Sequence, residues 1–184
     1  MRKILCVVLI MLVLCGCNGE KSMDSVLGLR GKLQNGSSHF DAVITADYGD
    51  RVFHFTLSCS CDPEGNLQFN VVSPDTISDI SGSITASGGK LEFDDTALAF
   101  PLLADGQLSP VSGPWVMMKA LLGGYIQSAG ADGEYLRATI LDSYAEDAMT
   151  VDVWLNEKLI PVQGEILWDG RRILTIKVEN FEIA

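Results

Sequence analysis

Residues 39–62, HFDAVITADYGDRVFHFTLSCSCD, alternate apolar and polar side chains on both sides of Gly49-Asp50. A period of two is typical of half-buried β-strands, because successive side chains of a strand point to opposite faces of the sheet. Phe53 and Phe55 belong to the apolar face of the second run. The segment therefore predicts two antiparallel strands joined by a tight turn.

The alternation continues along most of the chain. The turn sequence DPEGN at 62–66 leads into a strand at 67–71, and Asp169-Gly170 is a strong hairpin signal near the end. Gly164 predicts a bulge or bend in a curved sheet. With the first two strands, these segments give about ten antiparallel strands, the others being expected at 80–86, 90–93, 96–101, 134–141, 149–155, 159–168 and 172–181.

One strongly apolar helix is expected between the strands. Residues 112–114, SGP, form a cap followed by proline in the first turn, and Gly123-Gly124 ends the helix. The intervening sequence WVMMKALL carries Lys119 as its one charge. A helix that is apolar almost all round must be covered on more than one side. We therefore expect it to lie against the concave face of the curved sheet.

A second, short helix is expected before the first strand. Residues 18–22 are small and polar and indicate a spacer, and the residues after them favour a helix that ends before Gly36. The expected apolar stripe of this helix consists of Met23, Val26, Leu27 and Leu33. The fold class predicted from the sequence is β-rich α+β: a half-barrel of antiparallel strands with two helices.

The first seventeen residues have the pattern of a secretion signal. Arg2 and Lys3 precede an apolar run, residues 4–14, which is too short to cross a membrane. Residues 14–17, LCGC, resemble the lipobox of bacterial lipoproteins. The resemblance implies cleavage before Cys17 and diacylglycerol on its sulfur, with palmitate-type acyl chains as the membrane anchor.

This interpretation predicts the cellular location and the domain organisation. Residues 1–16 are the signal peptide, 17–36 are the lipid-anchored tether and short helix, and 37–184 are the half-barrel domain. The mature chain is expected on the extracytoplasmic side of the cell membrane, as part of the cell envelope. The alternative is an ordinary secretory signal, but no A-x-A-like cleavage site is present between residues 12 and 24.

The charge of the chain argues against nucleic acid as a partner. Without Arg2 and Lys3, 11 basic side chains face 24 acidic ones, which gives a net charge of −13 (11 − 24). Phosphate backbones and anionic lipid surfaces would repel such a protein. Attachment to a membrane therefore needs a hydrophobic anchor.

Two cysteines, Cys59 and Cys61, lie in the predicted folded part of the mature chain. Their spacing places both thiols on one face of a strand, where they are buried or edge thiols or form a strained bridge at the strand end. A metal site would need further ligands, and His39 and His54 are the only histidines. We therefore expect no metal and no cofactor.

The sequence contains no catalytic motif. It has no G-x-S-x-G, H-E-x-x-H, phosphate-binding loop or dinucleotide fingerprint, so we expect the protein not to be an enzyme. A hydrolase that uses His54 is the alternative, and it predicts turnover that vanishes in His54→Ala.

The order of these elements, from about Asp24 to the end, resembles the LolA/LolB-like half-barrel superfamily of lipoprotein carriers, receptors and lipid-binding lipoproteins. Residues 69–74, 108–110 and 176–181 are most similar to Gram-positive envelope lipoproteins of this kind. The resemblance implies a cavity between sheet and helix that binds a lipid, a lipoprotein or another apolar ligand. Methionine suits such a lining because its side chain adapts to different ligands. The candidate ligand-binding residues are Trp115, Met117, Met118, Leu121, Leu122, Phe53 and Phe55.

Two other interpretations stay open at this point. An apolar helix against a sheet is most often only core, in which case no ligand enters. The chain is then a non-enzymatic adhesion or assembly module that binds another envelope protein through the edge of its sheet or an acidic face.

Overall fold

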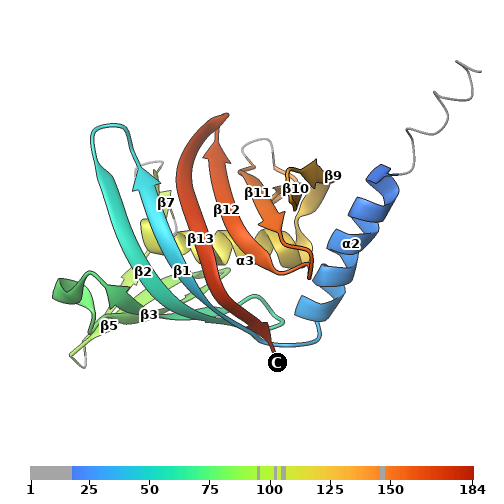
Figure 1. Ribbon diagram of the computed structural model, residues 1–184. Helices are drawn as coiled ribbons and strands as arrows, with labels where there is room; N and C mark the ends of the chain where they lie inside the picture. Colours follow the sequence, from blue (N-terminus) through green and yellow to red (C-terminus); the bar gives the residue numbers. More distant parts are fainter. Residues whose placement is uncertain (1–17, 95, 102, 105–106, 146–147) are drawn as a thin grey trace, which may run out of the picture.

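The computed structural model describes residues 18–94, 96–101, 103–104, 107–145 and 148–184. Most of this part of the chain is β-sheet, and Figure 1 shows the sheet curving around one helix. In chain order the elements are α2 (Asn18–Leu33), β1 (Ser38–Asp47), β2 (Val52–Cys61), β3 (Leu67–Ser73), η1 (Asp75–Ile77), β4 (Ser81–Thr85), β5 (Gly88–Phe93), β6 (Thr96–Phe100), β7 (Leu103–Ala104), β8 (Gln107–Leu108), η2 (Pro110–Ser112), α3 (Gly113–Gly123), β9 (Tyr125–Asp132), β10 (Tyr135–Leu141), β11 (Thr150–Leu155), β12 (Pro161–Trp168) and β13 (Arg171–Ile183).

The described residues form one open, antiparallel, eleven-stranded sheet and a small β7–β8 pair. The order in the large sheet is β6-β5-β4-β3-β2-β1-β13-β12-β11-β10-β9. Every neighbouring pair in it is consecutive in sequence except β1 and β13, whose register places Ala42 opposite Val178 and Ile44 opposite Ile176. Two meanders thus meet at one long-range pairing. The predicted fold class, a curved antiparallel sheet with few helices, is confirmed.

Helix α3 lies against the concave face, as the sequence predicts. Its residues from Gly113 to Met118 and from Ala120 to Leu122 are buried. Two glycines permit this close packing. A Cβ on Gly164 of β12 would lie 2.8 Å from the Met117 sulfur, and one on Gly113 would lie 3.1 Å from a methyl of Leu174. The backbones of helix and sheet can therefore approach closely where these side chains are missing.

The sequence predicts a bulge or a bend at Gly164; the bulge is absent there, and the bend stays a prediction. The register of β12 with its neighbours shifts between Trp154 and Leu155 and between Ile166 and Leu167, and runs regularly through Gly164. The missing side chain instead makes room for Met117 of α3. The need for a glycine at this position comes from α3, which is distant in sequence. The alternation of residues within the strand therefore cannot predict it.

Helix α2 packs along β9 and against the C-terminal end of α3. The Arg30 guanidinium donates hydrogen bonds to the carbonyl oxygens of Leu121 and Gly124, both at 2.8 Å, and the Gln34 amide donates to that of Leu122 at 2.9 Å. These carbonyls lack partners within the helix because they end it. Partial burial in this contact lowers the pKa of Arg30. One helix therefore caps the other.

Three details of the N-terminal and middle segments differ from the sequence prediction. The helix begins at Asn18, so the expected spacer at 18–22 is helical. Its buried positions are Val26, Leu29 and Leu33, whereas Leu27 is 47% exposed, because the stripe follows the contact with β9 and α3. Strand β9 was not predicted, since its sequence YIQSAGAD carries no sustained apolar alternation.

We expect Gly164→Val to lower the free energy of unfolding by about 1–3 kcal/mol, because the new side chain overlaps Met117 in a filled core. Chemical denaturation of both proteins measures the difference. Gly130→Val in β9 is the control, since a Cβ there meets no atom within 4 Å. An equal decrease in the free energy of unfolding of the two variants would show that α3 does not pack closely against β12.

We expect Arg30→Ala to lower the free energy of unfolding by about 1–3 kcal/mol, because the terminal carbonyls of α3 lose a charged donor. Thermal unfolding followed by circular dichroism measures this loss. Lys21→Ala, at an exposed position of the same helix, is the control and should leave the midpoint unchanged. An Arg30 variant as stable as this control would contradict the capping role.

Candidate apolar binding surface

Helix α3 covers only part of the concave face. It packs on β10 to β13 and reaches β2, but it makes no comparable contact with β4, β5 or β6. Cross-strand register places Phe69, Gly82, Leu91 and Leu98 in one row on this face of β3 to β6. The uncovered part of the sheet therefore presents the concave side of its strands without a helix above it.

We call the partly exposed apolar side chains of this region the concave wing. It combines residues from strands β2, β5 and β6, and its most exposed members are Leu98 at 64% and Phe93 at 54%. The register gives no charged residue on this face of the three strands, because Lys90 and Glu92 alternate onto the opposite face. The wing consists of Phe53, Phe55, Leu91, Phe93, Leu98 and Phe100.

Aromatic contacts hold part of the wing in place. The rings of Phe53 and Phe55 stack with centroids 6.3 Å apart, and the Tyr48 ring meets Phe53 edge-on at 6.1 Å. The Phe100 ring lies directly over Gly89, where any Cβ would overlap it. A glycine beneath an aromatic ring lets the ring lie flat on the sheet, so the wing is a preformed surface.

The structure separates the predicted ligand-binding residues into two groups. Phe53 and Phe55 lie in the concave wing. The helix residues are in the core, with exposed fractions between 0% and 9%: Trp115, Met117, Met118, Leu121 and Leu122. Their contact with a ligand stays a prediction. Leu91, Phe93, Leu98 and Phe100 were not predicted, because their strands are short and a weak alternation was their only signal.

Trp115 shows how firmly the helix is fixed. Its indole N–H donates to the carbonyl oxygen of Gly65 at 2.9 Å, and the Lys119 ammonium lies 5.3 Å from the centre of its ring. Lys119 also pairs with Asp142 at 3.5 Å. The Lys119 side chain thus extends to the solvent-exposed surface, where it pairs with Asp142. The other side chains of α3 pack in the apolar core.

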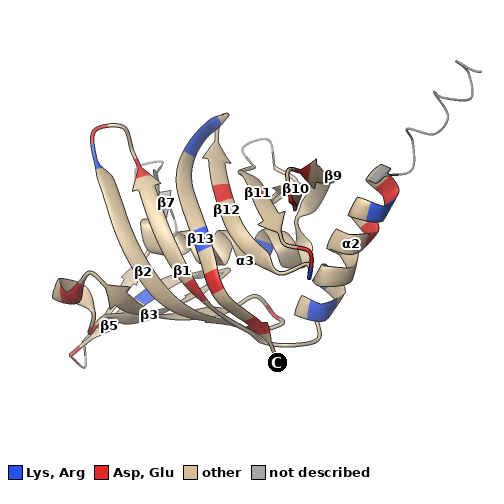
Figure 2. Cartoon of the chain, in the orientation of Figure 1, with Lys and Arg blue, Asp and Glu red and all other residues tan. Residues whose placement is uncertain are grey.

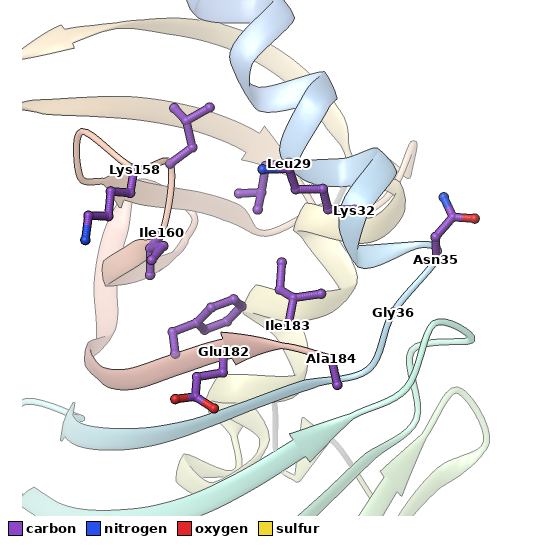
Figure 3. A pocket seen from close by; sticks show the side chains of 11 residues that line it. Leu29, Lys32, Asn35, Gly36, Lys158, Ile160, Glu182, Ile183 and Ala184 are labelled. Atoms are coloured by element: carbon purple, nitrogen blue, oxygen red, sulfur yellow. The ribbon is translucent and has the colours of Figure 1, made fainter.

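A second apolar recess lies at the C-terminal end of α2. This pocket of about 640 Å³ runs between α2, the turn before β12 and the end of β13. Figure 3 shows Leu29 of α2, Ile160 and Ile183 around this pocket. Lys32, Lys158 and Glu182 also line the pocket, so charged groups surround it. The concave wing is therefore the less polar of the two surfaces.

Charged residues lie elsewhere on the molecule. Figure 2 shows them on α2, at the turn between β1 and β2 and along β13. On the outer face of the sheet, the buried Asp152 carboxylate accepts hydrogen bonds from Arg137 and Thr139, both at 2.6 Å. The bond to Asp152 raises the pKa of Arg137. This arrangement satisfies a buried acid and points to a structural role.

The hydrolase alternative gains no support from the surroundings of His54. Its Nδ1 lies 3.2 Å from the Thr45 hydroxyl in an exposed contact between β1 and β2. No group of three or more metal-ligating side chains is present among the described residues. That the protein is not an enzyme stays a prediction.

Cys59 and Cys61 are buried, free thiols on the concave side of β2. Burial raises the pKa of Cys59, and it raises the pKa of Cys61 to about 12. The pKa of each thiol is higher in the folded protein than in the unfolded chain. Their contribution to stability is therefore fully present below the pKa of the unfolded chain, and it is lost as the pH rises toward the pKa of the folded protein. Of the two possibilities left by the sequence, buried thiols are confirmed.

The proposed membrane anchor lies outside the described residues. Cys17 and the rest of the predicted signal, residues 1–16, are not among them. Within residues 18–184 as described, no helix is long and apolar enough to cross a membrane. Attachment through a lipid on Cys17 therefore stays a prediction.

Comparison with known proteins finds likeness in structure alone. No protein-family model matches the chain, and no curated protein does either. A putative outer membrane lipoprotein-sorting protein domain from Vibrio parahaemolyticus is similar at 8% identity and a TM-score of 0.48, over 90% of this chain and 93% of that one. A LolA superfamily protein from Nitrosomonas europaea is similar at 7% identity and a TM-score of 0.44, over 86% and 93%.

A third solved structure is similar to the same degree. LprF from Mycobacterium bovis shares 11% identity at a TM-score of 0.44, over 90% of this chain and 95% of that one. These values describe a similar course of the chain and assign neither a family nor a ligand. The structure belongs to the class of open antiparallel half-barrels with a helix on the concave face.

We expect Cys59 and Cys61 to resist alkylation by iodoacetamide at pH 8 in the folded protein, because both thiols are buried and protonated there. Peptide mass spectrometry after timed labelling measures each site. In guanidinium chloride the same sites should react within minutes, as free thiolates form. Rapid labelling of the folded protein would mean that this face of β2 is open to solvent.

Proposed function

We propose that this chain is an envelope lipoprotein that binds a lipid or another apolar ligand on the concave wing. The observation that carries the proposal is the set of exposed apolar side chains on the concave side of β2, β5 and β6. Phe53, Phe93 and Leu98 are between 38% and 64% exposed on the same side of one sheet. Phe93 and Leu98 lie on neighbouring strands, and a patch of exposed apolar side chains is typical of binding sites.

The chemistry of the wing favours an acyl chain as ligand. The concave side chains of β2, β5 and β6 offer aromatic rings and aliphatic branches, with Thr96 as the one polar side chain among those of β5 and β6. A hydrocarbon needs no hydrogen-bond partner and gains about 25 cal/mol for each Å² of apolar surface removed from water. A charged or sugar-like ligand would lose its hydration there without a replacement.

The predicted lipid on Cys17 complements this activity. It would hold the domain beside a bilayer, where acyl chains are abundant, while the net negative charge of the chain keeps the protein from lying flat on an anionic lipid surface. Carrying or receiving lipids or lipoproteins at the membrane is the task that this combination suggests. The support lies in the wing and the lipobox, and the structural likenesses add no weight.

The test is native mass spectrometry, with lipid extraction, on a version that starts at Asn18 and is mixed with envelope lipids. We expect discrete apolar adducts that fall about tenfold or more in Phe53→Glu and Phe93→Glu, because a carboxylate in the wing removes the stabilisation of one buried ring, about 1.5–3 kcal/mol. Circular dichroism verifies that each variant is folded.

Val52→Glu is the matched control. Val52 is 52% exposed and neighbours Phe53, but it lies on the opposite face of β2, opposite Asp47. Its adducts should equal those of the wild type. A clean, unliganded mass in the wild type, or equal loss in all three variants, would sink the proposal.

A further inference from the structure

The two edges of the large sheet differ in how they are protected. Strand β9 forms one edge, and helix α2 packs along it. Strand β6 forms the other edge, and within the described residues its partner in the sheet is β5 alone. An edge strand carries unpaired N–H and C=O groups that can pair with another chain, and proteins usually cover or disfavour such edges.

Strand β6 is short and is followed by Pro101, but the strand itself lacks the charges, prolines and bulges that usually protect an edge. Its sequence from Thr96 to Phe100, TALAF, contains no charged residue and no proline, and its register with β5 has no bulge. The side chains from Thr96 to Ala99 are exposed, with Leu98 at 64%. From this we propose that β6 binds an extended segment of another polypeptide by strand addition.

The two faces of the edge specify the chemistry of that segment. On the concave side an added strand would lie beside Leu98 and Phe100, so its side chains on that side should be apolar. On the outer side it would continue the row of Ser81, Glu92 and Ala97. Ala97 ends this row with a single methyl group, which leaves room for a long side chain to reach across it.

The outer side is acidic. A recess of about 430 Å³ beside the start of β6 is lined by Asp79, Glu92 and Asp94, with Lys90 as the only basic residue lining it. Lys90 pairs with Glu92 at 2.5 Å, so two carboxylates in excess remain. Lysine or arginine on the outer side of the added strand would balance them. The expected partner is therefore an extended segment in which apolar and basic residues alternate.

A second copy of this chain fits the edge less well. A second β6 would present Ala97 and Ala99 where the acidic recess favours a cation. Both copies would carry the same net charge of −11. The charge of the chain therefore favours a basic partner over a second copy.

The register indicates which groups of β6 would form the new hydrogen bonds. Residues of an antiparallel pair alternate between bonding to each other and facing away. The turn at Asp94 closes with Phe93 opposite Thr96, and a two-residue turn closes on a bonded pair, so Thr96, Leu98 and Phe100 bond to β5. The N–H groups of Ala97 and Ala99 then face outward. Proline at an outward position removes the donor and is tolerated on an edge strand.

The experiment measures fluorescence anisotropy of a labelled peptide of about nine residues, alternating valine and lysine, with the full chain in neutral detergent. We expect binding to the wild type that weakens about tenfold or more in Ala99→Pro, because an edge hydrogen bond is lost. Ala99→Ser keeps the N–H and should bind like the wild type. Replacing lysine by glutamate in the peptide should also weaken binding about tenfold.

A peptide with N-methyl groups on its edge-facing amides tests the same bonds without changing the protein, which covers the case that Ala99→Pro does not fold. It should not bind. Absence of binding by the valine–lysine peptide, or equal binding by its N-methylated form, would overturn the proposal. A concentration-dependent dimer in sedimentation velocity that Ala99→Pro abolishes would also overturn it, by assigning the edge to a second copy. The peptide assay contains no lipid and reads the edge hydrogen bonds, so its failure is distinguishable from a failure of the proposed lipid binding, although both sites include Leu98.

Discussion

The rest of the structure depends on the burial of α3 against the concave face of the sheet. The helix has no polar face, so it needs cover on several sides, and β10 to β13 supply it. Gly164 and Gly113 let the two surfaces approach. Helix α2 then finds its place through Arg30 and Gln34, which bond to the carbonyls at the end of α3. The position of α2 therefore depends on the position of α3, which in turn depends on the sheet.

This packing divides the sheet into a covered and an uncovered half. One helix of eleven residues cannot span a concave face built from eleven strands, so Phe93 of β5 and Leu98 of β6 stay exposed to solvent, while Ile84 of β4 is buried. Exposed apolar surface is costly in water, and a ligand that covers it removes the cost. The same geometry explains why Trp115 and Met117 are core while Phe53 and Phe93 are accessible.

The uncovered half is also where the sheet ends without protection. Strand β6 combines an apolar concave side with small residues on its outer side, and the nearby carboxylates are Asp94 in the preceding turn, Glu92 on β5 and Asp79 before β4. A lipid would occupy the face of this half, and a polypeptide would extend its edge. The two sites adjoin at Leu98, so occupation of one alters the surface offered to the other.

The sequence by itself determined most of the strands, the apolar helix and the open antiparallel class. Alternation and turn residues act over a few neighbours, so segments such as 39–62 reveal their structure locally. It also singled out Phe53 and Phe55. The remaining wing residues were missed because strands as short as Thr96–Phe100 give too few alternations to identify a face.

The tertiary structure alone decided the β1–β13 pairing, the place of β9, the purpose of Gly164 and which face stays uncovered. Each of these depends on contacts between residues far apart in the chain. Ile44 meets Ile176 and Arg30 meets Leu121 because the burial of α3 brings their elements together. A local sequence pattern cannot predict such long-range contacts, because the free energy that stabilises them comes from the packing of the whole core.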